Sequence, residues 1–132
     1  MPKKRLLIFI VAYNAEKKIE GVLERIPQEL FQRADLDAEV LIIDDCSVDK
    51  TFSTARTHAY AGRIPVRVLK NPKTLGYGGN QKLGYEYALL HKFDVVALLH
   101  GDGQYAPERL PELLESIVSG ESDVVFGSRM IR

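Results

Sequence analysis

The chain has 132 residues, of which 45% are hydrophobic and 27% charged, and this length suits one domain with a sizeable core. Eighteen Lys and Arg residues balance 18 Asp and Glu residues, so no basic excess indicates a nucleic-acid-binding protein. The first apolar run, 6–12, is too short to span a bilayer and lacks a signal-peptide cleavage site. Cys46 is the single cysteine, which excludes an intrachain disulfide, and we expect a cytoplasmic location.

Five apolar runs predict β-strands. The runs at 6–12 and 40–43 are continuous and rich in Ile, Leu and Val, as is typical of strands buried on both faces of a sheet. Shorter runs predict further strands at 66–69, 95–99 and 123–126.

Helices are predicted between these strands. Apolar residues spaced i, i+3, i+4, i+7 form one stripe beginning at Ile19 and another beginning at Leu110. Asp49 is a candidate N-cap for a helix over about 50–61. Residues 76–79 predict a glycine-rich loop, with a helix after it to about His91. Pro107 suits the first position of the last helix.

The alternation of strands and helices predicts an α/β fold, with a mostly parallel open sheet and helices on both faces. Right-handed crossovers bring the carboxyl ends of all strands to one edge of the sheet, where ligands bind in open α/β folds. Polar clusters follow four of the predicted strands. These clusters are Tyr13-Asn14, Asp44-Asp45, the segment 100–104 and Ser128-Arg129.

Two adjacent carboxylates, Asp44 and Asp45, end the second predicted strand. One interpretation is structural: one of the pair forms a turn, and Asp49 caps the following helix. The functional interpretation is that one carboxylate accepts hydrogen bonds from a ligand. The imide N–H of uracil, or the N1–H and exocyclic amine of guanine, would suit such an acceptor.

The glycines at 76, 78 and 79 would let a ligand approach the backbone closely, although a plain flexible loop has the same composition. This segment is not the dinucleotide-binding fingerprint, because Gln81 holds the place of its third glycine.

The segment 100–104 places Asp102 between two glycines directly after a buried strand. Asp102 fits an oxygen ligand for Mg²⁺ or Mn²⁺, and a turn-forming role is the alternative. His100 is a candidate second ligand or base, or a histidine with a structural role at the strand end. Arg129 suits a phosphate, or an ion pair with an acidic neighbour.

Taken together, these segments resemble the family 2 inverting glycosyltransferases of the GT-A fold. The segment "LIIDDCSVDKT" is similar to that family's "VVDDGSTDGT", and "LLHGDGQYAPE" is similar to the strand that carries its D-x-D motif. The segments "IVAYNAEKKI" and "NPKTLGYGGNQKLGYEYA" resemble its opening strand and its glycine loop. The segment "DVVFGSR" is similar to the polyprenyl-phosphate sugar transferase branch.

The resemblance implies a bound nucleotide-diphosphate sugar. Asp45, with Asp44 beside it, would bind the base, Asp102 would hold the metal on the diphosphate, and Arg129 would face the diphosphate or an acceptor phosphate. The full implied site comprises Ala12, Tyr13, Glu16, Asp44, Asp45, Gly76, Asp102, Gln104 and Arg129. His100 replaces the first aspartate of D-x-D, and it is a poorer ligand for Mg²⁺ than a carboxylate but acceptable to Mn²⁺.

The implied reaction transfers a sugar with inversion from a UDP- or GDP-sugar to an acceptor, with a polyprenyl phosphate as one candidate. The metal and Arg129 would stabilise the departing nucleoside diphosphate. Family members continue with an acceptor-binding region, often with a catalytic acid, and many carry membrane helices. We therefore expect a carboxyl-terminally truncated donor-binding part, with negligible transfer alone, of a protein at the cytoplasmic face of a membrane.

Other functional classes fit the sequence less well. A phosphoryl-receiver module needs its acidic pair after the first strand and a lysine after the fifth, where this chain has Tyr13-Asn14 and Arg129. A sugar nucleotidyltransferase needs a glycine-rich basic loop after the first strand, which "AYNAEKK" is not. A non-catalytic nucleotide-binding module remains an alternative.

Overall fold

The computed structural model describes residues 3–62, 64–101 and 106–118. Within these residues, four parallel strands form one sheet in the order β3-β2-β1-β4. The strands are β1 (Lys4–Ala12), β2 (Leu36–Asp44), β3 (Val66–Lys70) and β4 (Val95–His100). Each contains a strand predicted from an apolar run, and the predicted fifth strand at 123–126 lies outside the described residues.

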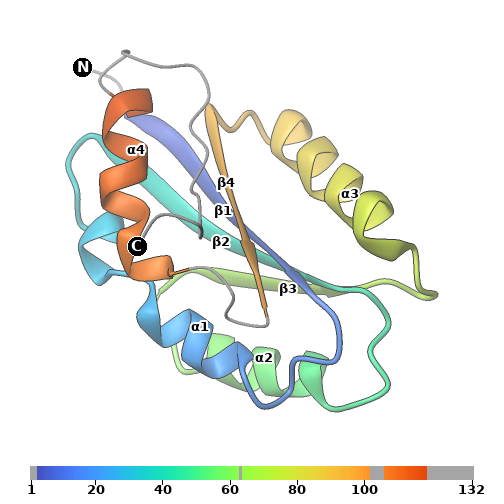
Figure 1. Cartoon of the computed structure of the whole chain (residues 1–132). Coiled ribbons are helices and arrows are strands. Elements are labelled where there is room, and N and C mark those ends of the chain that lie inside the picture. Colours follow the sequence, from blue (N-terminus) through green and yellow to red (C-terminus); the bar gives the residue numbers. More distant parts are fainter. Residues whose placement is uncertain (1–2, 63, 102–105, 119–132) are drawn as a thin grey trace.

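Helices cover both faces of the sheet, as Figure 1 shows. On one face, α1, α2 and α4 contribute apolar side chains to a large cluster, whereas α3 packs on the other face. This arrangement confirms the predicted α/β fold class. The helices are α1 (Ile19–Arg25), α2 (Thr51–Tyr60), α3 (Gly76–Leu90) and α4 (Leu110–Val118), with short 3₁₀ helices η1 (Gln28–Phe31) and η2 (Pro107–Arg109).

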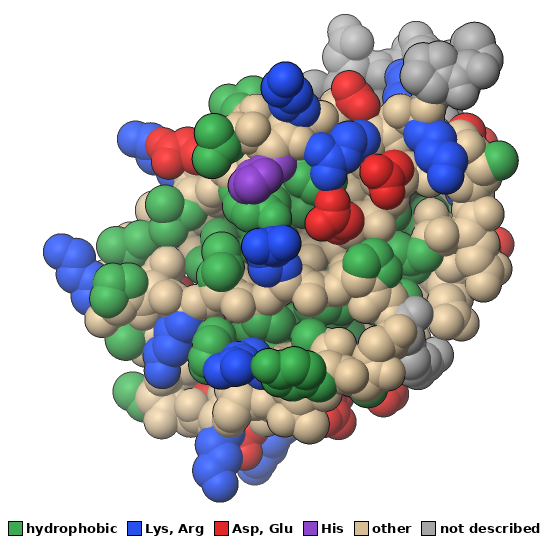
Figure 2. Space-filling view, turned by 180° about the vertical axis from the view of Figure 1, so that it is seen from behind, with side chains coloured by type: hydrophobic (Ala, Val, Ile, Leu, Met, Phe, Trp, Pro, Cys, Tyr) green, Lys and Arg blue, Asp and Glu red, His purple; other side chains and the backbone are tan. Residues whose placement is uncertain are grey.

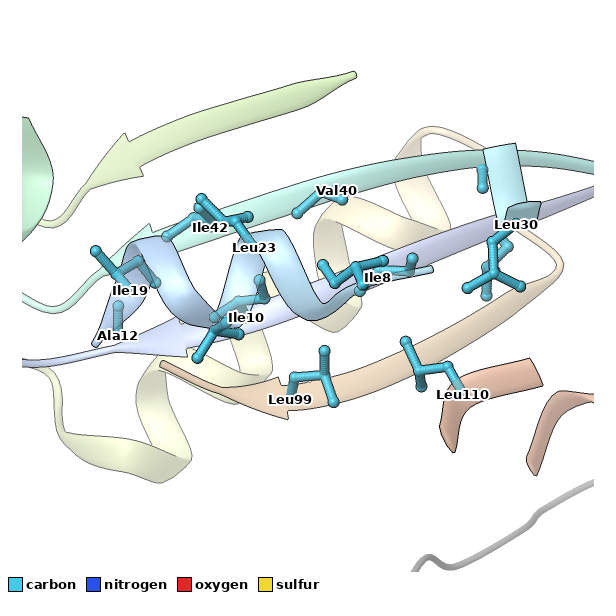
Figure 3. Close-up of a cluster of buried hydrophobic side chains, with 14 of the residues drawn as sticks. Ile8, Ile10, Ala12, Ile19, Leu23, Leu30, Val40, Ile42, Leu99 and Leu110 are labelled. Atoms are coloured by element: carbon cyan, nitrogen blue, oxygen red, sulfur yellow. The ribbon is translucent and has the colours of Figure 1, made fainter. Parts of the chain in front are cut away.

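The central strand β1 joins the two layers because its side chains alternate between them. Ile8 and Ile10 point into the larger cluster, where they meet Leu23 of α1 and Leu99 of β4 (Figure 3). Phe9, between them, belongs to the smaller cluster under α3. A strand with both faces covered needs a continuous apolar sequence, which explains the run at the start of the chain.

The strand register brings the carboxyl ends of three strands together. Ala12 at the end of β1 pairs with Asp44 at the end of β2, and Val11 pairs with His100 at the end of β4. The residues that follow these strands therefore meet at one edge of the sheet.

Two local predictions need correction. The expected loop at 76–79 is instead the first turn of α3, which begins at Gly76 because the Asp45 carboxylate accepts the N–H groups of Leu75 and Gly76. The expected N-cap Asp49 lies one residue too early, since Lys50 occupies that position. Asp49 nevertheless accepts the Thr51 N–H, at 3.0 Å.

The last predicted helix also begins differently. Pro107 is the first residue of η2, and α4 follows from Leu110. None of the helices in the described residues is long and apolar enough to cross a membrane. Basic and acidic side chains are interspersed on the face seen in Figure 2, in keeping with the balanced charge of the sequence.

Candidate functional site

A cavity of about 410 Å³ opens at the carboxyl ends of β1, β2 and β4, beside the first turn of α3. Its position agrees with the rule that open α/β sheets bind ligands outside the carboxyl ends of their strands. The lining residues come from these three strand ends, from the segment before α3 and from its first turns. They are Val11, Ala12, Tyr13, Asp45, Thr74, Gly76, Tyr77, Asn80, His100 and Gly101.

The chain after β4 crosses close to the end of β1. The Gly101 N–H donates to the Val11 carbonyl at 2.8 Å. A Cβ atom on Gly101 would lie 3.2 Å from the Ala12 Cβ and 3.3 Å from the Ile19 Cδ1. Glycine at this position therefore lets the segment that leads to Asp102 pass directly over β1.

The two adjacent carboxylates have different partners. Asp44 is fully buried, and its carboxylate accepts hydrogen bonds from the N–H and the hydroxyl of Ser47. These are the contacts of a turn-forming residue, and Asp44 does not line the cavity. Asp45 lines the cavity, so the structure separates the pair into one turn residue and one cavity residue.

Asp45 ties the end of β2 to the start of α3. Its Oδ1 accepts from the Asn71 amide at 2.9 Å and from the Leu75 N–H at 2.8 Å, and its Oδ2 accepts from the Gly76 N–H at 3.0 Å. A negative charge is favourable at a helix N-terminus. A carboxylate has about four acceptor sites, so Asp45 can accept a further hydrogen bond from a ligand in the cavity.

The predicted residues after β1 divide between the cavity and the neighbouring loop. Ala12 and Tyr13 line the cavity. Glu16 is instead directed to the loop before α2, where its Oε1 accepts the Lys50 N–H at 2.9 Å. The structure therefore does not bring Glu16 to the cavity wall.

Asp49 strengthens this junction between the two loops. It accepts the Glu16 N–H at 3.2 Å as well as the Thr51 N–H. Burial raises the pKa of the Asp49 carboxyl, but the hydrogen bonds from Thr51 and from the Glu16 backbone outweigh burial and hold this pKa below its usual value.

His100 stands at the cavity wall against Tyr77. The two rings are stacked, with centroids 5.0 Å apart and an interplanar angle of 24°, and the His100 Nε2 lies 3.1 Å from the Tyr77 Oη. The sequence analysis did not single out Tyr77. It also missed Asn71, although that residue directly follows β3 and so meets the criterion used for the other strand ends.

The predicted metal site is described in part. His100 contributes one candidate ligand, and the described residues contain no cluster of three or more His, Cys, Asp or Glu side chains that could hold an ion. Asp102, Gln104 and Arg129 lie outside the described residues, so their placement at the cavity stays a prediction.

Comparison with known proteins gives close sequence relatives. The chain is 30% identical over 128 residues to dolichol-phosphate mannosyltransferase of Pyrococcus furiosus, covering 97% of this chain and 34% of that protein. It is 34% identical over 129 residues to undecaprenyl-phosphate mannosyltransferase of Micrococcus luteus, covering 96% of this chain and 49% of that protein. The chain thus spans about a third to a half of the length of these relatives.

Solved structures support the fold. The mannosyltransferase PcManGT from Pyrobaculum calidifontis, in complex with GDP-Man and Mn²⁺, matches 76% of this chain and 28% of its own with a TM-score of 0.64 and 22% identity. S. aureus TarS 1-349, in complex with UDP-GlcNAc, matches 89% of this chain and 31% of its own with a TM-score of 0.60 and 19% identity. These matches confirm the predicted architecture as that of the GT-A nucleotide-sugar transferases.

The family assignment comes from the sequence profile described as glycosyl transferase family 2, which matches residues 7–132. This match covers every segment on which the predicted resemblance depends. The chain therefore belongs to glycosyl transferase family 2.

Proposed function

We propose that this chain binds the donor substrate of a glycosyltransferase that transfers a sugar, with inversion, from a nucleotide-diphosphate sugar to a polyprenyl phosphate. The observation that carries the proposal is the cavity at the strand ends, which has Asp45 in its wall in a chain of glycosyl transferase family 2. The names of the relatives, which include dolichol-phosphate and undecaprenyl-phosphate mannosyltransferases, favour a polyprenyl phosphate acceptor.

The nucleoside would occupy the part of the cavity between β1 and β2. Tyr13 is 52% exposed and offers an apolar ring to the base, while Asp45 accepts a hydrogen bond from a base N–H. Guanine and uracil both carry such donors, and the solved relatives were found with GDP-Man and UDP-GlcNAc. Both nucleotides are therefore donor candidates, with GDP favoured by the mannosyltransferase relatives.

The diphosphate would lie toward the end of β4. Asp102 and His100 are the residues that would hold a divalent cation there, and Mn²⁺ is the ion present in the PcManGT complex. When bound, this cation would neutralise charge on the departing nucleoside diphosphate. Arg129 would pair with the same phosphates through its guanidinium group.

The acceptor sets the place of action. A polyprenyl chain resides in a bilayer, so transfer to its phosphate would occur at a membrane surface, and we assign the cytoplasmic face because nucleotide sugars are made in that compartment. A phosphate acceptor is already anionic near neutral pH, so it needs little help from a base.

Calorimetric titration of the chain with GDP-mannose and UDP-GlcNAc, in Mn²⁺ and in EDTA, tests this function. We expect one donor to bind in Mn²⁺ and to bind more weakly in EDTA, because an acidic cavity repels a bare diphosphate. Asp102→Ala should remove most of that difference. If neither donor binds under either condition, the proposed function is wrong.

Asp45→Asn tests the base contact. This change replaces an acceptor with a donor and should weaken nucleotide binding by roughly tenfold to a hundredfold, as expected from a cost of about 1–3 kcal/mol for a buried mismatch. Because Asp45 also anchors α3, urea unfolding of the variant must show that the fold persists. Asp37→Asn, at the opposite end of β2, is the matched control, and equal binding by all three proteins would contradict the contact.

A further inference from the structure

Tyr77 has a position in the cavity wall that its exposure alone would not suggest. Its ring is half exposed, yet it stacks on the His100 ring at 5.0 Å and its hydroxyl lies 3.1 Å from the His100 Nε2. Tyr77 comes from the first turn of α3, whereas His100 is the last residue of β4. The contact therefore joins two separate elements across the cavity.

Gln81 determines the direction of the hydrogen bond in this pair. Its side-chain amide nitrogen, one helical turn after Tyr77, lies 2.8 Å from the Tyr77 Oη. An amide N–H₂ group can only donate, so the Tyr77 oxygen accepts from Gln81 and keeps its own O–H to donate. With the imidazole neutral, the Tyr77 O–H donates to His100, which makes Nε2 the unprotonated nitrogen and places the ring proton on Nδ1.

The position of Tyr77 is itself anchored. Asp45 accepts the N–H groups of Leu75 and Gly76, the two residues directly before Tyr77. Asn71 donates to the same carboxylate and also to the Asn80 side chain, one turn further along α3. The turn that presents Tyr77 to His100 is thus fixed to the end of β2 by buried polar contacts.

We propose that Tyr77 is a positioning residue of the nucleotide-sugar cavity, which holds the His100 imidazole in the wall with Nε2 directed to the tyrosine hydroxyl. The inference about the ligand rests on the proposed function, whereas the hydrogen bond belongs to the ligand-free protein. His100 takes the place of the first aspartate of the family motif, and Tyr77 orients its ring. While the bond to Tyr77 is made, Nε2 is not available to a cation.

Nitrogen NMR of the ligand-free chain tests the hydrogen bond. With ¹⁵N-labelled histidine at about pH 8, above the ordinary histidine pKa, the ring-nitrogen shifts report which nitrogen carries the proton. We expect His100 to be the Nδ1–H tautomer in the parent and to shift toward Nε2–H in Tyr77→Phe, which keeps the ring but lacks the hydroxyl. His100→Gln assigns the signals.

Tyr85→Phe is the matched control, since Tyr85 lies two turns further along α3 and makes the same substitution away from the cavity wall. It should leave the His100 signals unchanged. An Nε2–H tautomer in the parent, or the same tautomer in parent and Tyr77→Phe, would overturn the hydrogen bond.

Titration with GDP and with UDP in Mn²⁺ tests the positioning role. Tyr77→Phe should weaken the binding nucleotide by about two- to tenfold, as for one lost hydrogen bond, and Tyr85→Phe should not. Equal affinities for the parent and Tyr77→Phe would overturn this role. If the parent binds no nucleotide, the proposed function fails, while the NMR result still decides the tyrosine–histidine contact.

Discussion

At the scale of single residues, the loops beside the cavity hold two side chains in the left-handed backbone region. Asn14 has φ of 49° and Cys46 has φ of 61°. Asn14 suits this conformation, because asparagine tolerates it and the Asn14 Oδ1 accepts the Val48 N–H at 3.0 Å. Cys46 has a weaker compensation, a contact of 3.8 Å from its Sγ to the Pro72 carbonyl. The related family segment, "VVDDGSTDGT", has glycine at the place of Cys46.

Cys46→Gly should therefore stabilise the fold. Relief of a left-handed non-glycine residue gains about 1–2 kcal/mol, and the greater freedom of glycine in the unfolded chain offsets about 0.4–1 kcal/mol of it. We expect a net gain of about 1 kcal/mol in the free energy of urea unfolding. Cys46→Ala keeps the Cβ atom and should stay close to the parent, so an equal gain in both variants would contradict the backbone explanation.

At the scale of elements, α3 can lie close to the sheet because it has glycine where it crosses β1. A Cβ atom built on Gly84 would stand 2.0 Å from the Cε2 of Phe9, a ring that is fully buried. Phe9 and Ala88 belong to the same small cluster, so the approach of the helix fixes how that cluster packs. The same helix carries Tyr77 and Gln81 at its other end, which links this packing to the cavity.

Gly84→Ala should destabilise the protein although alanine favours a helix by about 1 kcal/mol over glycine. The added methyl group must displace Phe9 or the helix, and overpacking of this kind costs about 1–3 kcal/mol or more. Urea unfolding measures the difference. Gly78→Ala, in the same helix but with no atom within 4 Å of the added Cβ, should be neutral or stabilising. A stable Gly84→Ala variant would show that α3 has room to move.

At the scale of the whole molecule, several carboxylates bind parts of the chain together in their charged form. Glu108 of η2 accepts two hydrogen bonds from Arg25 of α1, at 2.7 and 2.8 Å, and these contacts with the Arg25 charge lower the pKa of Glu108. Hydrogen bonding to Arg33 lowers the pKa of Asp35, and the pKa of Asp49 is lowered as described above. Each of these groups is more easily charged in the folded than in the unfolded protein.

The fold should accordingly lose stability in acid. A carboxyl whose folded pKa is depressed contributes fully above its unfolded pKa, which is about 4, and the contribution is lost as the pH falls through the folded pKa. Glu108→Gln should be less stable than the parent at neutral pH by at most about 1 kcal/mol, because the ion pair is half exposed. The difference should shrink below about pH 4.

Urea unfolding across this pH range measures that convergence. Glu24→Gln removes one negative charge from the same helix as Arg25 and serves as the control for net charge. A difference between parent and Glu108→Gln that stays constant down to pH values well below 4 would contradict the assigned coupling to Arg25.

The sequence by itself determined the fold class and the edge of the sheet that carries the site. Strands buried on both faces need continuous apolar runs, and the runs at 6–12 and 95–99 could be recognised without a structure. Alternation with helical stripes then implied parallel strands, whose carboxyl ends meet. The motif segments also indicated glycosyl transferase family 2, which the match over residues 7–132 establishes.

Only the tertiary structure decided what each polar residue contacts. Sequence proximity could not separate Asp44 from Asp45, because successive residues at a strand end point to opposite sides and their partners come from distant segments. The start of α3 at Gly76 depends on the Asp45 carboxylate, 31 residues earlier. Tyr77 reaches His100 only because α3 and β4 pack beside the same strand. Local pattern encodes burial and period, whereas hydrogen-bond partners distant in sequence are set by packing.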